Sequence, residues 1–175
     1  NTHLNAWGDL IFRTRDWETD KKIKRQTWIF SGGKRVSQLN KDNPILPLAN
    51  TISTLLYGDN YMKIYENYFA SVNFSKRYEN GVRFNASALY EDRIPLANTT
   101  DFVIFKKSAK NITPNFAYKD TTPYPSVAHQ AFIVSFEISI KPGQKYIQFP
   151  NRKMSLGSNY PTFSLSYTKG IQNVF

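Results

Sequence analysis

The 175-residue sequence contains no cysteine and only two histidines. Without thiols the chain forms neither disulfides nor thiolate metal sites, which excludes a small secreted domain held together by disulfides. It also has no apolar run of about 18 residues, which excludes a transmembrane helix but not transmembrane strands. No charged and apolar leader is found at Asn1, so we expect any signal peptide to have been removed or to lie outside this sequence.

Motifs that carry catalysis are also missing. The sequence has no Gly-rich phosphate loop, nucleophile elbow or His-Glu metal motif. His3 and His129 have no partner at a diagnostic spacing, and a polar position at a strand end suits each better than a catalytic role. Glu91 and Asp92 are adjacent, so on a strand they point to opposite faces and cannot act as a carboxylate pair. We therefore predict that the protein is not an enzyme and holds no metal or cofactor.

Positive charge is in excess, with 23 Lys and Arg against 13 Asp and Glu and a net charge of +10. The basic residues form clusters that we expect mostly at strand ends: Lys21, Lys22, Lys24 and Arg25; Lys34 and Arg35; Lys106, Lys107 and Lys110; Arg152 and Lys153. Solvated loops without a specific role, contact with anionic lipid and binding of nucleic acid all stay open. Nucleic acid is the least favoured, because it would require one basic face with stacking aromatics, so none is expected as a partner.

Aromatic residues are abundant at 15%, which is typical of all-β structure, and one long hairpin between Tyr61 and Arg93 has the clearest pattern. Apolar and polar side chains alternate along both limbs, which predicts strands with one apolar and one polar face. Paired residues must share a face, and a three-residue loop achieves this by setting Tyr78 opposite Val82. The third loop position needs a left-handed conformation, and Gly81 occupies it.

The hairpin is long enough to cross a membrane. Ten residues separate Tyr68 from Tyr78, and they extend roughly 33 Å at about 3.3 Å per residue. Tilted by about 40°, this length covers roughly 25 Å, the height of the apolar band of an outer-membrane barrel. Tyr68, Tyr90 and Tyr78 lie where such barrels carry aromatic girdles, and Lys76 can extend to the interface. The alternative is a water-soluble sheet with the same face packed on a core.

The alternation divides the strand residues into two sets. A strand from Gln130 to Lys141 continues the pattern of the hairpin. The predicted lipid-facing residues are Tyr68, Ala70, Val72, Phe74, Phe84, Ala86, Ala88, Tyr90, Phe132, Val134, Phe136 and Ile138. The predicted lumen-facing residues are Asn73, Ser75, Asn85 and Ser87. Phe69 and Leu89 break the alternation.

The remaining chain predicts further strands and one helix. Strands are expected over 3–14 and from Ile23 to Phe30, the second ending at Ser31-Gly32-Gly33 before a polar loop over 34–43. A short helix near 48–57, ending at Gly58, has Leu48, Ile52, Leu55 and Leu56 on one face, which we expect to pack inward. A plug or interfacial role for this helix is the alternative.

The C-terminal part is expected to loop over 150–161 after a turn at Pro142-Gly143 and to return in a last strand through Phe163, Leu165 and Tyr167. The fold class is therefore all-β, an antiparallel meander of about seven or eight long strands with one short helix near 48–57. We expect it to form part of a transmembrane β-barrel.

Several phrases resemble a known family. They are His3-Leu4-Asn5 with Gly8-Asp9, Lys24-Arg25-Gln26-Thr27, Asn60-Tyr61-Met62-Lys63-Ile64-Tyr65-Glu66, Gly143-Gln144-Lys145-Tyr146-Ile147-Gln148, and Tyr160-Pro161-Thr162-Phe163. The resemblance is to Bacteroidota outer-membrane proteins in which a carboxypeptidase-regulatory-like domain precedes a surface-antigen-type β-barrel of uncharacterised function. It implies a location and an architecture, and it carries no activity over to any residue.

These observations favour an outer-membrane β-barrel protein of unknown activity, with transport or envelope assembly as the expected classes. Residues 1–175 form a single region, interpreted as a fragment of a larger barrel. The expected partners are outer-membrane lipid, including anionic lipopolysaccharide, and the remainder of its own barrel, whose strands would pair with the open edges. The alternative function is a soluble β-rich binding module whose basic loops contact an anionic ligand.

Overall fold

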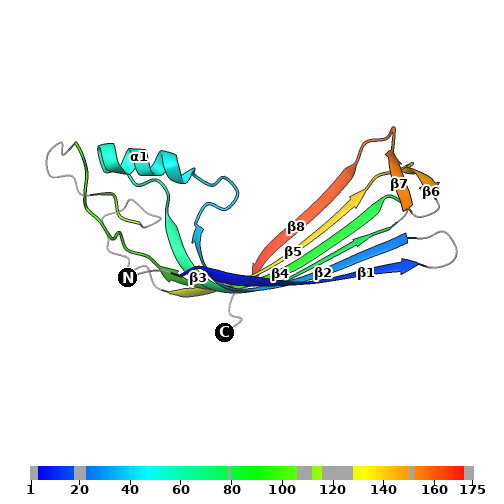
Figure 1. The fold of residues 1–175 in the computed structure, drawn as a ribbon, viewed down its shortest axis with the longest axis horizontal. Coiled ribbons are helices and arrows are strands. Elements are labelled where there is room, and N and C mark those ends of the chain that lie inside the picture. The colour runs from blue at the N-terminus through cyan, green and yellow to red at the C-terminus, as the bar shows by residue number, and fades with distance from the viewer. Residues whose placement is uncertain are drawn as a thin grey trace. The chain divides into compact units, whose positions relative to one another are not determined.

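The structure is a computed structural model that describes residues 4–17, 23–78, 80–105, 112–115, 128–149 and 152–171. Within these ranges the chain forms eight β-strands and one α-helix (Figure 1). In chain order they are β1 (Ala6–Trp17), β2 (Ile23–Gln38), α1 (Pro47–Tyr57), β3 (Ile64–Arg77), β4 (Val82–Pro95), β5 (His129–Ile140), β6 (Lys145–Phe149), β7 (Arg152–Gly157) and β8 (Phe163–Ile171).

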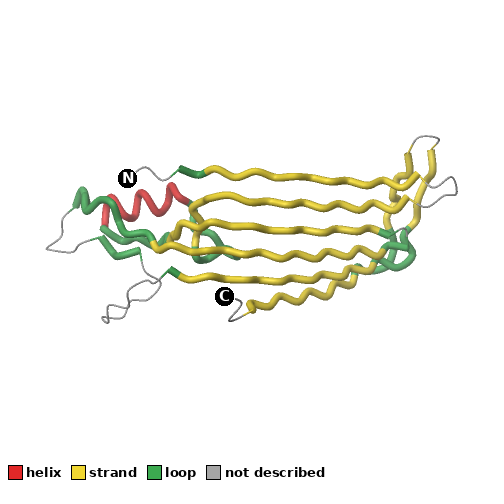
Figure 2. Tube along the Cα trace, turned by 90° about the horizontal axis from the view of Figure 1, so that it is seen from below, coloured by secondary structure: helices red, strands yellow, loops and turns green. Residues whose placement is uncertain are grey.

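Six strands form one antiparallel sheet in the order β1-β2-β3-β4-β5-β8. Each strand lies beside its neighbour in sequence, except that the short β6–β7 ribbon is inserted between β5 and β8 (Figure 2). The pairing of β5 with β8 sets Phe136 opposite Tyr167 and Ile138 opposite Leu165. The meander and the single short helix confirm the predicted fold class, although β6 and β7 are short, with five and six residues.

The turn between β3 and β4 has the predicted register. The backbone N–H of Tyr78 donates to the carbonyl of Val82 at 2.8 Å, so this pair closes the hairpin as expected. Gly81 has a φ of 83°, the left-handed conformation that the third loop position requires. The Gly81 carbonyl also accepts from the backbone N–H of Lys141 at 3.0 Å, where β5 ends. A Cβ at Gly81 would overlap the Lys141 carbonyl oxygen, a constraint that the hairpin sequence alone does not contain.

The predicted end of the second strand was wrong. β2 continues through Gly32 and Gly33 to Gln38, so five residues of the expected polar loop belong to the sheet. Pairing with β3 accounts for the extension: the Leu39 N–H donates to the Lys63 carbonyl at 2.9 Å just beyond the strand. The turn preference of two glycines is local, and hydrogen bonding to a neighbouring strand overrides it.

The expected loop over 150–161 was also wrong, because it contains β7. This strand pairs with β6, with Ile147 opposite Met154 and an irregularity after Lys145. A strand of six residues next to a proline has too little alternation to be recognised from sequence. The last predicted strand is confirmed as β8, and Gly143 has the positive φ, 62°, that the expected turn requires.

Helix α1 begins with Pro47 and ends at Gly58, whose φ is 75° and whose N–H donates to the Thr54 carbonyl at 2.9 Å. Its bounds confirm the predicted helix. The expected inward face was wrong for Leu48 and Ile52, whereas Leu55 and Leu56 are half-buried. Leu48 is 73% exposed and Ile52 is 50% exposed, whereas the buried helical residue is Asn50. The hydrogen bonds of Asn50 orient this helix, and they have no periodic sequence pattern. No helix in the described part of the chain is long and apolar enough to cross a membrane.

The chain divides into two compact units. The helix unit comprises Asn1–Ala6, Lys34–Tyr68 and Asp92–Gln130, and the sheet unit comprises Trp7–Gly33, Phe69–Glu91 and Ala131–Phe175. The buried apolar residues of the helix unit are Tyr65, Val103 and Ile112, and that of the sheet unit is Phe69, counted over the described residues. Phe69, which interrupts the alternation in sequence, is thus a core residue. Much of the apolar surface is therefore exposed.

The basic clusters are only partly within the described residues. Lys21, Lys22, Lys106, Lys107 and Lys110 lie outside them. Lys34 and Arg35 were expected in a loop, but both lie inside β2. The Lys34 ammonium contacts the Glu66 carboxylate, with Nζ 2.7 Å from Oε1. This ion pair belongs to the structure of the helix unit rather than to a basic loop.

Candidate functional site

Polar side chains of the sheet unit gather on one face and line an open hollow of about 370 Å³. Most of its lining residues are hydroxyl or amide side chains, and one is a carboxylate. The polar lining residues are Thr27, Asn73, Ser75, Asn85, Ser87, Ser135, Glu137, Ser166 and Thr168, and the apolar ones are Ile29, Phe74, Ala86 and Phe136. We call this feature the hydroxyl hollow. It extends over β2, β3, β4, β5 and β8.

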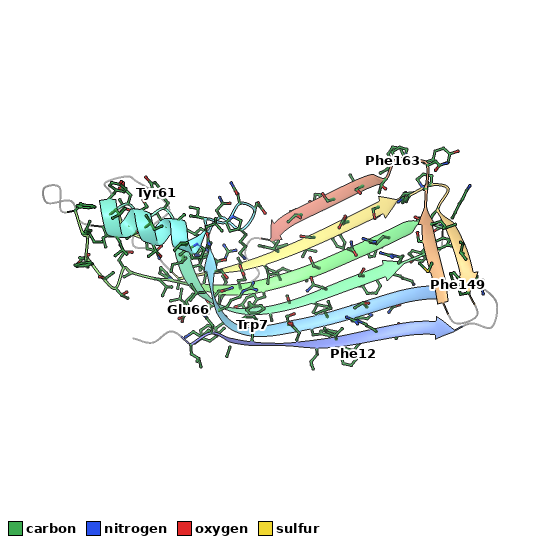
Figure 3. All side chains as sticks on the ribbon, turned by 45° about the horizontal axis from the view of Figure 1, so that its top comes forward. Trp7, Phe12, Tyr61, Glu66, Phe149 and Phe163 are labelled. Atoms are coloured by element: carbon green, nitrogen blue, oxygen red, sulfur yellow. The ribbon has the colours of Figure 1, made fainter. Side chains whose placement is uncertain are left out.

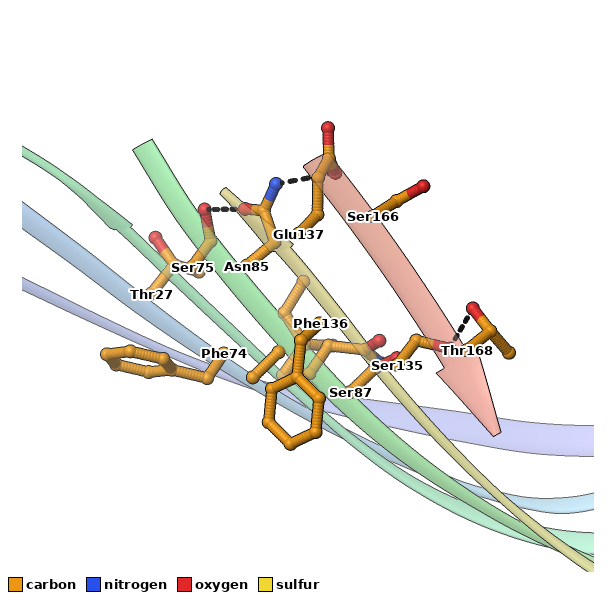
Figure 4. A pocket seen from close by; sticks show the side chains of 13 residues that line it. Thr27, Phe74, Ser75, Asn85, Ser87, Ser135, Phe136, Glu137, Ser166 and Thr168 are labelled. Atoms are coloured by element: carbon orange, nitrogen blue, oxygen red, sulfur yellow. Dashed lines mark hydrogen bonds between the residues drawn. The ribbon is translucent and has the colours of Figure 1, made fainter. Parts of the chain in front are cut away.

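Hydrogen bonds connect the polar side chains from strand to strand. The Ser75 hydroxyl donates to Asn85 Oδ1 at 2.8 Å, and Asn85 Nδ2 donates to Glu137 Oε2 at 3.0 Å (Figure 4). On β8, the Thr168 hydroxyl donates to Ser135 Oγ at 3.0 Å. Each bond joins adjacent strands, because residues opposite one another in an antiparallel sheet point to the same side. The sheet register therefore builds the hollow.

All four predicted lumen-facing residues lie in the hydroxyl hollow. Asn73, Ser75, Asn85 and Ser87 come from the central hairpin, and the structure brings them together on one face. The sequence prediction missed the hollow residues of β2, β5 and β8. The same alternation marks Ser135 and Glu137 on β5, but only the strand pairing shows that they extend the same surface. Whether that surface faces a lumen stays a prediction.

The opposite face of the sheet unit is apolar and aromatic. Phe74 and Phe136 project away from Ser75, Asn85 and Glu137 (Figure 4). A chain of rings crosses four strands, with centroid distances of 6.0 Å for Phe12–Phe30, 6.2 Å for Trp28–Phe30, 4.5 Å for Trp28–Phe74 and 6.0 Å for Phe74–Phe84. Such ring pairs stabilise a sheet by about 0.5–1.5 kcal/mol each beyond area burial. Within the sheet unit, period-two alternation puts the other predicted lipid-facing residues of β3, β4 and β5 on this face, whereas Tyr68 belongs to the helix unit.

This apolar face is largely exposed. Phe136 is 45% exposed and its partner Tyr167 is 58% exposed. Phe12 and Phe163 project from the two strands at the edges of the sheet (Figure 3). β8 adds Phe163, Leu165, Tyr167 and Ile171 to the face, through their pairing with Ile140, Ile138, Phe136 and Phe132. The prediction omitted these residues, although their alternation was visible. Lys169, opposite Val134, is the exception on this face.

Charged side chains accompany the two tyrosines at which the apolar stretch of β3 was predicted to end. In the sheet unit, Lys76 Nζ lies 5.1 Å from the ring centroid of Tyr78. In the helix unit, Lys34 Nζ lies 5.2 Å from the ring centroid of Tyr68 while it contacts Glu66. A cation over an aromatic ring is typical of a boundary between apolar and aqueous surroundings.

The helix unit is held together by amide side chains. Oδ1 of the buried Asn50 accepts hydrogen bonds from the backbone N–H groups of Tyr61 and Met62, both at 2.8 Å. Asn50 Nδ2 donates to Asn60 Oδ1 at 3.0 Å, and Asn60 Nδ2 donates to Asn98 Oδ1 at 3.4 Å. Because buried backbone groups are costly without partners, this network fixes the segment that follows α1.

Asn115, further along the chain, also holds the helix unit together by hydrogen bonds to backbone groups. It accepts from the Ile64 N–H at 2.8 Å and donates to the carbonyls of Ile64 and Leu96 at 2.6 and 2.8 Å. Nearby, Lys63 Nζ donates to the Pro114 carbonyl at 2.5 Å, and burial of the ammonium group lowers the pKa of Lys63. These contacts satisfy backbone groups, so we interpret them as structural.

The described residues contain no group of three or more His, Cys, Asp or Glu side chains that would hold a metal ion. The hydroxyl hollow offers many weak donors and acceptors together with one carboxylate, and its described lining includes no histidine or lysine. This arrangement suits contact with water and polar solutes.

Comparison with known proteins identifies the family without assigning an activity. No curated protein matches the chain, and no solved structure does. The model of the C-terminal domain of a family of unknown function, DUF5686, matches residues 1–175. The match extends over the helix unit and the sheet unit alike, so the hydroxyl hollow and the amide network lie in the same domain. The chain belongs to this family, as its C-terminal domain.

Proposed function

We propose that the sheet unit is part of the wall of an outer-membrane β-barrel, with the aromatic face toward lipid and the hydroxyl hollow toward a hydrated lumen. The protein would then serve transport across the outer membrane or assembly of the envelope. The twelve predicted lipid-facing residues and the four predicted lumen-facing residues keep these roles in the proposal. β3 and β4, with 14 residues each, exceed the 9–11 or so residues that a tilted spanning strand needs.

The observation that carries the proposal is the exposed aromatic face opposite the polar one. In a water-soluble sheet the apolar face is covered by a second layer, and exposed apolar patches rarely exceed a few hundred Å². The sheet unit instead exposes Leu165 at 74% and Phe12 at 57%, near the two edges of the same sheet. Lipid is the solvent for which an apolar outside and a polar inside are the stable arrangement.

The finer features of the proposal come from the sequence resemblance. We place the chain in a Bacteroidota outer-membrane protein whose N-terminal part includes a carboxypeptidase-regulatory-like domain. Within the described chain, β1 and β8 are the edge strands of the sheet, each with a single neighbour. Unpaired edges are liable to aggregate, so the remainder of the barrel is the expected partner of both strands. Anionic lipopolysaccharide is the expected lipid contact of the basic residues at the strand ends.

Fractionation of cells that express the full-length protein tests the location. We expect the protein in the outer-membrane fraction, resistant to extraction by alkaline carbonate and released by detergent. A periplasmic soluble protein provides the control for leakage between fractions. Recovery of folded, monomeric protein in the soluble fraction without detergent would contradict the proposal and favour the alternative, a soluble β-rich module that binds an anionic ligand through basic loops.

A further inference from the structure

The side chains of the hydroxyl hollow could bind a ligand, and the barrel proposal does not say which one. Residues such as Ser75, Ser87 and Thr168 each present a hydroxyl that can both donate and accept, and Asn73 and Asn85 present both functions on separate atoms. Neighbouring strands place such groups about 4.8 Å apart, and alternate residues of a strand place them about 6.6 Å apart. The result is a grid of donors and acceptors rather than one concentrated charge.

Glu137 is the single acid among the described lining residues, and a hydrogen bond from Asn85 orients its carboxylate. Asn85 Nδ2 donates to Oε2 at 3.0 Å, and Asn85 is itself held by the Ser75 hydroxyl. Glu137 is exposed, and no described side chain contacts its Oε1 within hydrogen-bonding distance. A carboxylate accepts strongly from hydroxyl groups, because a bond to a charged acceptor is shorter and stronger than a neutral one.

The lining also excludes other ligand classes. None of the described residues that line the hollow is Lys or Arg, so this described lining offers no counter-charge to phosphate and carboxylate ligands. The aromatic lining residues, Phe74 and Phe136, direct their rings to the opposite face, so no ring is available for stacking (Figure 4). A volume of about 370 Å³ lies within the range of small-molecule sites, about 300–1,000 Å³.

We infer that the hydroxyl hollow is a weak-binding site for neutral polyhydroxylated solutes, such as short oligosaccharides, with Glu137 as its strongest acceptor. The inference rests on the proposed function, because it requires this face to contact water. Sugar hydroxyls match a grid of groups that both donate and accept, and Glu137 can accept from two neighbouring hydroxyls. Without stacking rings the affinity is low, which suits a surface along which solutes pass.

Protection of an introduced thiol tests this inference in the full-length protein. The chain has no cysteine, so Ser166→Cys introduces the only thiol of this region at a lining residue that is exposed. In outer-membrane vesicles we expect the trisaccharide raffinose, in excess, to slow modification by a charged methanethiosulfonate reagent several-fold. Thr99→Cys, exposed and outside the hollow, is the matched control and should react at an unchanged rate.

A second variant tests whether the protection by raffinose depends on Glu137. In the Ser166→Cys background, Glu137→Gln keeps the shape of the side chain and removes its charge, so raffinose protection should decrease while reactivity without sugar remains. Equal reactivity with and without raffinose would overturn the inference and leave the barrel proposal intact. Protection by inorganic phosphate but not by raffinose would overturn it in favour of an anion site. A Ser166→Cys thiol that does not react in folded protein would contradict both proposals.

Discussion

The sheet unit and the helix unit are stabilised by different kinds of contact. In the sheet unit the same period-two pattern recurs on strand after strand, and it produces one aromatic and one hydroxyl-rich face. In the helix unit individual amide side chains bond to particular backbone groups, as Asn50 does to the N–H groups of Tyr61 and Met62. In the sheet unit, the effect of a substitution should therefore depend on which face the residue occupies. In the helix unit, it should depend on the hydrogen bonds that the substituted side chain makes.

The largest effect should come from a charge on the aromatic face. In a bilayer, Val72→Arg should destabilise the full-length protein by about 2–4 kcal/mol, whereas Asn73→Arg, one residue away on the opposite face, should cost much less. The free energy of unfolding in lipid vesicles, measured by urea titration, gives both values. Equal losses at the two positions would show that the faces do not differ in environment.

The turn glycine should have the next largest effect. Gly81 combines a φ of 83° with direct contact between its backbone and that of Lys141. From the turn alone, Gly81→Asn is expected to be milder than Gly81→Val, because Asn tolerates a positive φ. The adjacent strand changes this expectation: any Cβ overlaps the Lys141 carbonyl oxygen, so both variants should lose at least about 2 kcal/mol. The same urea titration measures them, and a near-neutral Gly81→Asn would refute the close approach.

The third largest loss of stability should come from removal of a single amide side chain in the helix unit. Asn50→Ala removes the buried acceptor of the backbone N–H groups of Tyr61 and Met62, which should cost about 2 kcal/mol. Hydrogen exchange at these two amides should accelerate about 30-fold, the equivalent of that free energy. Thr51→Ala is the matched control on the same helix, because the exposed Thr51 hydroxyl donates only to the Pro47 carbonyl. Comparable acceleration by both variants would argue against a special role for Asn50.

The smallest effect should come from single hydroxyls of the polar face. Ser166→Ala removes an exposed hydroxyl that makes no hydrogen bond to another described residue, so the free energy of unfolding should change by less than about 0.5 kcal/mol. A loss as large as that of Asn50→Ala would mean that the hydroxyl hollow is a packed core rather than a wetted surface. Urea titration of the variant in lipid vesicles provides the comparison.

The two units also differ in how far the sequence predicts them. The alternation around Phe74 and Asn85 and the glycine at position 81 are local, so they predicted the hairpin register and the two faces. The extension of β2 through Gly33 was missed, because it depends on pairing with a strand that begins at Ile64. The orientation of α1 was predicted wrongly, because its apolar stripe predicts that Leu48 points inward. The helix is instead oriented by hydrogen bonds from Asn50 to residues outside the helix, which the helix sequence does not reveal.

The candidate site was predicted in part for the same reason. The four predicted lumen-facing residues lie in one hairpin whose register is readable, and all four line the hydroxyl hollow. Thr27 and Thr168 lie far from that hairpin in sequence, and only the order of the strands in the sheet brings them to it. The chain of bonds from Ser75 through Asn85 to Glu137 crosses three strands and requires the pairing of β4 with β5.

The central claim is that the two faces of the sheet contact different solvents, and two adjacent residues of β4 test it most directly. Ser87→Cys and Ala88→Cys place thiols on opposite faces of the same strand, and the chain contains no other cysteine. In intact outer membranes with the full-length protein, we predict that a charged methanethiosulfonate reagent modifies Cys at position 87 rapidly and Cys at position 88 only after detergent or urea is added. Rapid modification at position 88 with protection at position 87, or equal rates at both, would contradict the account.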